Sequence, residues 1–273
     1  MILQGASRDS LAAARERLDT LAQNTSVDVV ALGEELFSVV RLLDRETSLR
    51  RILSDPAQPG EVKVSLVGAL VGDQLSEAAV DLVSGVVRSR WSQPRDLADA
   101  LEVLAVQAEV VAAERDGRLD DLEDELFRFG RIVAGQPPLR AALSDPVLPA
   151  DRKSGLLSEL LDGKVTDVTH RLVSHLVIHP RGRTIEQGLE EYARFAAERR
   201  ERIVALVDVA APLTETQKNR LQNALRRLYG HEVHLNIELD PTVLGGIRVR
   251  IGDEVIDGTI ASRLDEARRR LAG

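Results

Sequence analysis

One segment of the chain occurs twice, and the second copy begins 90 residues after the first. Composition alone would give about two or three matches over such a stretch, so chance is a poor explanation. The repetition predicts two similar structural units in tandem. The matching residues are Leu32, Glu35, Leu36, Phe37, Arg41, Leu49, Arg50, Leu53, Ser54, Asp55, Pro56, Pro59 and Lys63, repeated as Leu122, Glu125, Leu126, Phe127, Arg131, Leu139, Arg140, Leu143, Ser144, Asp145, Pro146, Pro149 and Lys153.

Each copy has the pattern of amphipathic helices. In the second copy, Leu122, Leu126, Phe129 and Val133 recur at helical spacing and predict one buried stripe. The Ser-Asp-Pro step shared by the copies interrupts the helices, because proline disfavours a helical conformation in the residue before it. We therefore predict an antiparallel helical bundle for each copy.

The spacing of apolar residues changes from helical to alternating near the end of the chain. Residues 233–239 and 247–251 alternate apolar and polar side chains, as strands do. Residues 204–210 form a third strand candidate, followed by a helix with a capping box of Thr214 and Gln217. A last amphipathic helix is predicted over 260–271. The predicted fold is mainly α: a first helical bundle over 1–95, a second over 96–203, and a small C-terminal α/β domain over 204–273.

The composition excludes several classes of function. Cysteine is absent, which rules out disulfides and thiolate chemistry. The formal net charge of −8, with both signs interspersed, argues against nucleic-acid binding. There is no phosphate-binding glycine loop, no metal-ligand spacing among the five histidines and no catalytic constellation, so we expect no cofactor, metal or enzymatic activity. Without a long apolar run, we also expect no direct membrane insertion.

The C-terminal third carries an ordered string that resembles the delta subunit family of F-type ATP synthases, called oligomycin-sensitivity-conferring protein in mitochondria. The string runs DPTVLGGIRVRIGDEVIDGTI from Asp240 to Ile260. The second helical copy, with LRAALSDPVLP and HPRGR, resembles the helical domain of the same family, whereas the first copy is an addition seen in a longer form. The family signature residues are Asp240, Pro241, Leu244, Gly245, Gly246, Gly252, Asp253, Ile256, Asp257 and Gly258.

The resemblance implies a non-catalytic stator subunit at the cytoplasmic face of the cell membrane. Its helical domain would bind the N-termini of the alpha subunits in the catalytic head, and its C-terminal domain would bind the b-type subunits of the peripheral stalk. An amphipathic partner helix lying in a groove between helices is the expected mode of contact. The candidate head-binding residues are Leu101, Leu104, Ala108, Val111, Leu172, Leu176 and His179.

Three alternatives stay open at the level of sequence. A generic helical-repeat scaffold would explain the duplication but not the C-terminal signature. An enzyme carried by the α/β domain would need a cluster of acid, base or nucleophile. The single tryptophan, Trp91, is either a core residue at the junction of the bundles or an interface anchor.

Overall fold

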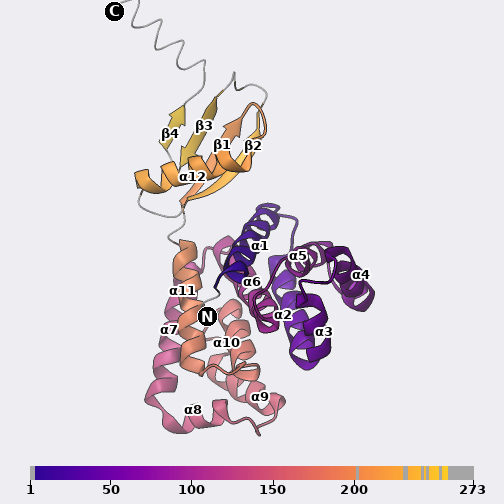
Figure 1. The fold of residues 1–273 in the computed structure, drawn as a ribbon. Helices are drawn as coiled ribbons and strands as arrows, with labels where there is room; N and C mark the ends of the chain where they lie inside the picture. Colours follow the sequence, from indigo (N-terminus) through magenta and orange to yellow (C-terminus); the bar gives the residue numbers. More distant parts are fainter. Residues whose placement is uncertain are drawn as a thin grey trace, which may run out of the picture. The chain divides into compact units, whose positions relative to one another are not determined.

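The computed structural model describes residues 4–200, 203–229, 233–240, 243, 246–251 and 254–257. The chain divides into two compact units, Met1–Ala197 and Glu198–Gly273. In the described residues, the regular elements of the first unit are all helices, and the second contains a small sheet, drawn in Figure 1. The predicted fold class, mainly α with a small C-terminal α/β domain, is confirmed.

The helices reproduce the sequence repeat. Helices α2 to α5 and helices α7 to α10 have bounds that differ by the same 90 residues as the repeated sequence. The first set is α2 (Val29–Arg45), α3 (Thr47–Ser54), α4 (Gly60–Val71) and α5 (Glu77–Arg88). The second set is α7 (Leu119–Gly135), α8 (Pro137–Ser144), α9 (Ala150–Leu161) and α10 (Asp167–Ile178).

The two copies also repeat a polar contact, which joins α5 to α2 in the first copy and α10 to α7 in the second. In the first copy, Ser76 at the start of α5 donates through its backbone N and its hydroxyl to Glu35. In the second copy, Thr166 makes the same two bonds to Glu125. Each glutamate accepts hydrogen bonds from donors at the N-terminus of a helix. The same contact therefore holds α5 and α10 in equivalent positions within their copies.

The long helix α6 (Pro94–Arg115) belongs to both copies. By the offset of the repeat, it corresponds to α1 (Ala6–Gln23), which opens the first copy, and to α11 (Ile185–Arg200), which closes the second. It contacts α1, α2, α3 and α5 of the first copy and α7 and α10 of the second. Most of its side chains are buried, and they join one continuous apolar core.

Close approach of α2 to α6 depends on a small residue. A Cβ atom added to Gly33 of α2 would lie 3.3 Å from the carbonyl oxygen of Ala105. The alanines of α6 therefore face a helix whose backbone is almost in contact with theirs. Trp91 lies at the start of this region, is buried, and donates its Nε1–H to the carbonyl of Val86 at 2.9 Å, as the core alternative predicted.

The second unit is a mixed four-stranded sheet in the order β2-β1-β3-β4. Strands β1 and β2 are parallel and joined by α12, while β3 is antiparallel to both β1 and β4. A core of Ala205, Val207, Val209 and Val249 packs with Leu225 of α12. The elements are β1 (Ile203–Val209), α12 (Glu215–Tyr229), β2 (Val233–Leu239), β3 (Ile247–Ile251) and β4 (Glu254–Asp257).

Most predicted elements of this unit are confirmed. The capping box is present. The backbone N–H of Gln217 donates to Thr214 Oγ1, and Gln217 Oε1 accepts from the backbone N–H of Thr214 at 2.8 Å. Strand β4 was not predicted, and the helix expected over 260–271 lies outside the described residues. Among the described helices, none has the length and apolar character needed to cross a bilayer.

Candidate partner-binding site

The residues predicted to bind the head lie inside the helical unit. His179 is half-buried, and the other six have almost no exposed surface. They belong to the apolar core and form no open groove. The six buried residues, with exposures of 0 to 2%, are Leu101, Leu104, Ala108, Val111, Leu172 and Leu176.

A helix of the first copy covers the neighbouring surface of α6 and α10. The ring of Phe37 on α2 stacks on His175 of α10 with 3.6 Å between ring centroids and 27° between planes. One turn earlier, Gly33 lies against Ala105 and the side chain of Glu109 on α6. Helix α2 thus packs along α6 and reaches α10 through the ring of Phe37.

An ion pair with a buried carboxylate joins α6 to α10. Arg171 of α10 donates through Nη2 to Glu109 Oε2 at 2.7 Å and through Nε to both oxygens at 3.1 Å. The Glu109 carboxylate has no exposed surface. Burial raises the pKa of Glu109, and the Arg171 guanidinium opposes that shift. Loss of Arg171 would leave a buried carboxylate unpaired.

Two consecutive residues in the loop between α10 and α11 have positive φ angles. Arg181 has a φ of 49° and is followed by Gly182 with a φ of 79°. An arginine in the left-handed region is strained by about 1–2 kcal/mol, so the surrounding contacts must hold it there. Its carbonyl accepts a bond from Arg95 Nη2 at 2.6 Å.

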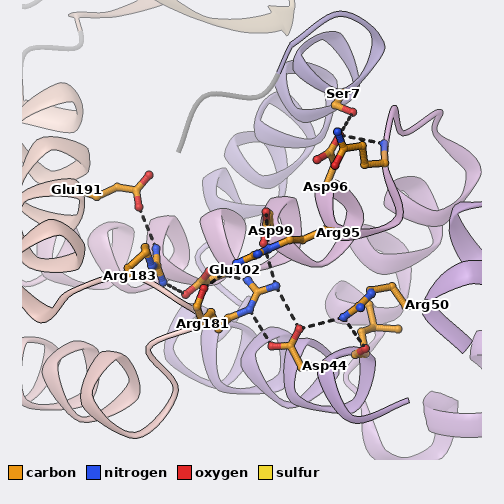
Figure 2. A network of polar contacts seen from close by, with 12 residues as sticks. Ser7, Asp44, Arg50, Arg95, Asp96, Asp99, Glu102, Arg181, Arg183 and Glu191 are labelled. Carbon is orange, nitrogen blue, oxygen red and sulfur yellow. Dashed lines mark hydrogen bonds and ion pairs between the residues drawn. The ribbon is translucent and has the colours of Figure 1, made fainter. Parts of the chain in front are cut away.

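The side chain of Arg181 connects the two copies. Its guanidinium reaches Asp44 Oδ2 of α2 at 2.7 Å, and Asp99 Oδ1 and Glu102 Oε2 of α6 at 2.8 and 2.7 Å. Figure 2 shows the three carboxylates converging on it. Arg50 of α3 approaches Asp44 from the far side at 3.4 Å. One strained loop residue therefore joins elements of both copies.

A second arginine of the same loop completes the cluster. Arg183 contacts Glu102 on α6 and donates through Nη1 to Glu191 of α11 at 2.9 Å. The hydroxyl of the fully buried Tyr192 lies 3.5 Å from Glu102 Oε1. We call Asp44, Asp99, Glu102, Arg181, Arg183 and Glu191 the arginine cluster.

The electrostatics of the arginine cluster favour charged arginines beside a neutral histidine. Burial lowers the pKa of Arg181, but the acidic groups Glu102, Asp99 and Asp44 outweigh it, so the net shift is upward. Burial lowers the pKa of His175 to about 2, with His179 and Arg41 adding to the effect. The Nε2 atom of His175 lies 3.9 Å from Glu102 Oε1. His175 is nevertheless neutral, because the cost of burying a charged ring outweighs the attraction of this carboxylate.

A cavity of about 540 Å³ opens beside the arginine cluster. Its lining alternates in charge, with Arg95 and Arg194 next to Glu190 and Glu191, so it selects neither an anion nor a cation. Within the described part of the chain, no group of three or more potential ligands is placed to hold a metal ion. The geometry suits attachment of helices to one another better than chemistry on a small molecule.

Part of the C-terminal signature is described. Asp240 donates its backbone N–H to the carbonyl of Val209 at 3.0 Å and accepts from the backbone of Val243 at 3.1 Å, forming a turn. Gly246 has a φ of 88°, in the left-handed region that glycine adopts without strain. Ile256 pairs with Val249 across β3 and β4, and Asp257 pairs with Arg248 in the backbone register. Outside the described residues are Pro241, Leu244, Gly245, Gly252, Asp253 and Gly258.

Sequence reasoning did not find the arginine cluster. Two signals were present: the acidic residues Asp99 and Glu102 interrupt the otherwise apolar run 97–106 one turn apart, and two arginines flank Gly182 in a short loop. Buried charges of opposite sign predict pairing, since an unpaired charge in the core is costly. The partners come from segments far apart in the chain, so their pairing could not be assigned without the fold.

Comparison with known proteins identifies the family. A family model described as ATP synthase delta (OSCP) subunit matches residues 106–271. The chain is 59% identical to the ATP synthase subunit delta of Streptomyces avermitilis over 272 residues, covering all of both chains. It is 52% identical to that of Thermobifida fusca, covering 99% of this chain and all of the relative.

A solved mitochondrial ATP synthase hexamer from Toxoplasma gondii contains a chain that is 18% identical over 62% of this one. The match covers 95% of that chain, but its TM-score of 0.29 is too low to support a structural argument. The full-length relatives include the first helical copy as well as the signature, which a generic scaffold would not explain. The chain belongs to the ATP synthase delta (OSCP) subunit family.

Proposed function

We propose that this chain links the catalytic head of an F-type ATP synthase to its membrane-anchored b-type stalk subunits and so resists the torque of the rotor. Membership of the family makes it a structural, non-catalytic subunit. The helical unit would bind the N-termini of the alpha subunits, and the C-terminal unit would bind the stalk. The complex would hold the chain at the cytoplasmic face of the cell membrane.

The observation that supports this role most is the full-length match to delta subunits together with the division into two compact units. A linker needs two separate binding regions, and the residues that carry the family signature all lie in the second unit, Glu198–Gly273. The arginine cluster supports the mechanical part of the proposal, because buried, multiply bonded ion pairs fix the helices of both copies in one arrangement.

Burial of the predicted head-binding residues refines where the head contact would form. Leu104 and Leu172 are covered by the chain itself, and α2 packs along α6. A partner helix could reach these leucines only by displacing part of the chain. We therefore propose that the head contacts exposed faces of the helical unit, with half-buried His179 the most accessible of the original candidates.

The test is a pull-down from solubilised membranes with the tagged full-length chain and with a chain truncated after Ala197. We expect the full chain to recover alpha, beta and b-type subunits, and the truncated chain to retain alpha and beta but lose b-type subunits. Recovery of b-type subunits by the truncated chain would refute the assignment of the stalk contact. Failure of the full chain to recover any of these subunits would refute the function.

A further inference from the structure

The sheet of the second unit has one apolar side and one polar side. Residues paired across neighbouring strands share a side, so Val207, Val249 and Ile256 lie together on one of them. Asp208 and Arg250 lie on the other side, where an ion pair at 3.9 Å joins them. The polar side can face water, whereas the apolar side gains stability from a layer of other apolar residues.

Helix α12 covers part of the apolar side. It contacts β2 and places Leu225 in one core with Val249. On the half of the sheet formed by β3 and β4, Ile247 and Ile251 are only half-buried, and Ile256 is 36% exposed. A helix is about 10 Å wide and strands lie about 4.8 Å apart, so one helix covers about two strands. Covering a sheet of four strands therefore takes a second helix.

The chain that follows β4 can supply this helix. Strand β4 is the edge strand beside β3 and ends at Asp257, and residues 258–273 lie outside the described part of the chain. The sequence predicts a helix over 260–271. Two residues connect it to β4, a length that is common between a strand and a helix. Its apolar residues recur at helical spacing: Ile260, Leu264, Ala267 and Leu271.

The dimensions and polarity of this segment match the half-covered surface. A helix over 260–271 is about 18 Å long at about 1.5 Å per residue, and β3 is about 17 Å long at about 3.3–3.4 Å per residue. Polar residues occupy the side of the helix opposite the apolar stripe, so the stripe can face the sheet while they face water. These polar residues are Ser262, Asp265, Glu266 and Arg269.

We infer that residues 260–271 form a helix that packs on the apolar side of β3 and β4 and completes a two-layer α/β unit. Because β4 is antiparallel to β3, a helix that turns back after β4 runs from Ile247 towards Ile251. Leu264, about 6 Å along the helix from its first residue, then lies above Ile256. This packing is a property of the chain by itself and does not depend on its partners.

Engineered cysteines test the packing, because the natural chain contains none. The test pair in the full chain is Ile256→Cys with Leu264→Cys, and the control pair is Val255→Cys with Leu264→Cys. Ile256 and Val255 are both exposed and adjacent, but they lie on opposite sides of the sheet. Dibromobimane becomes fluorescent when it bridges two nearby thiols. We expect the test pair to give at least about fivefold more bridged product within one chain than the control pair.

Hydrogen exchange of the full chain gives a second readout. We expect Leu264→Asp to speed amide exchange over 260–271 about tenfold or more, because it places a charge against the apolar side of the sheet. The matched change Arg269→Asp, on the polar side of the helix, should leave these rates unchanged.

Three results would overturn the inference and leave the proposed function intact. Equal bridging in the two cysteine pairs would show that the segment does not prefer the apolar side. Bridges between two chains would assign that side to a second copy. Exchange over 260–271 that is equally fast in Leu264→Asp and the wild-type chain would show that Leu264 packs against nothing.

Discussion

The buried imidazole of His175 makes the stability of the helical unit sensitive to acid. His175 lies between Phe37 and Glu102, and its Nε2 has no hydrogen-bond partner. Its pKa in the folded chain is about 2, against 6.5 in the unfolded chain. Only the unfolded chain therefore binds a proton on this residue as pH falls below 6.5, and the folded state loses stability there.

The expected loss follows from the two pKa values. Below pH 6.5 each unit of pH costs about 1.4 kcal/mol, so lowering the pH from 7 to 5 removes about 2 kcal/mol of unfolding free energy. That amount is a large fraction of the stability of a typical domain, which is about 5–15 kcal/mol. In the folded chain the ring stays neutral beneath Phe37 and near Arg41 and Arg183, so it binds a proton only after release from this contact.

Urea unfolding followed by circular dichroism at pH 7 and pH 5 measures this loss. The matched control is His175→Gln, which cannot titrate, while every carboxylate remains. We expect the wild-type chain to lose about 2 kcal/mol more than the variant between the two pH values. Equal losses in the two proteins would refute the reasoning and show that His175 is protonated in the folded chain.

Three further changes test the packing. Arg181→Met should cost about 3–5 kcal/mol of unfolding free energy because it leaves buried carboxylates without a partner. The control Arg88→Met, at an exposed ion pair, should cost less than about 1 kcal/mol, and thermal unfolding of the two variants measures the difference. Leu104→Glu should cost about 4 kcal/mol or more, since it buries a charge at a site without exposed surface, and an unchanged melting temperature would contradict that placement. Thr214→Ala should cost about 1 kcal/mol by removing the acceptor for the Gln217 N–H, seen as a lower melting temperature of the C-terminal unit.

The parts of the fold that could be predicted are those encoded locally. The repeat is visible by comparing the sequence with itself. The helical spacing around Leu122 and Leu126 and the alternation in 233–239 each lie within one element, so each segment could be interpreted alone. The capping box of α12 involves residues three apart and was found for the same reason. The family resemblance was likewise carried by a continuous string in the C-terminal third.

The candidate site could not be predicted in the same way, because it depends on which faces of α6 are covered. A stripe such as Leu101, Leu104 and Val111 has the same pattern whether it receives a partner helix or packs inside the chain. In this protein the first copy contributes the covering helix α2. The arginine cluster depends on contacts between residues as distant as Asp44 and Arg181, which no local pattern specifies.

The two copies share one apolar core. Helix α2 packs along α6, which contacts helices of both copies, and the buried residues of both copies belong to one cluster. Such a shared core would transmit force without a hinge between the copies. The division into a first bundle over 1–95 and a second over 96–203 remains a prediction.

The measurement that tests the central claim most directly is coupling in membrane vesicles from which this chain has been removed. If the chain is a stator subunit without catalytic activity, the released heads will hydrolyse ATP, and ATP-driven proton pumping will be absent until the purified full-length chain is added back. Proton pumping that persists without the chain, or that does not return after its addition to otherwise intact components, would contradict the account.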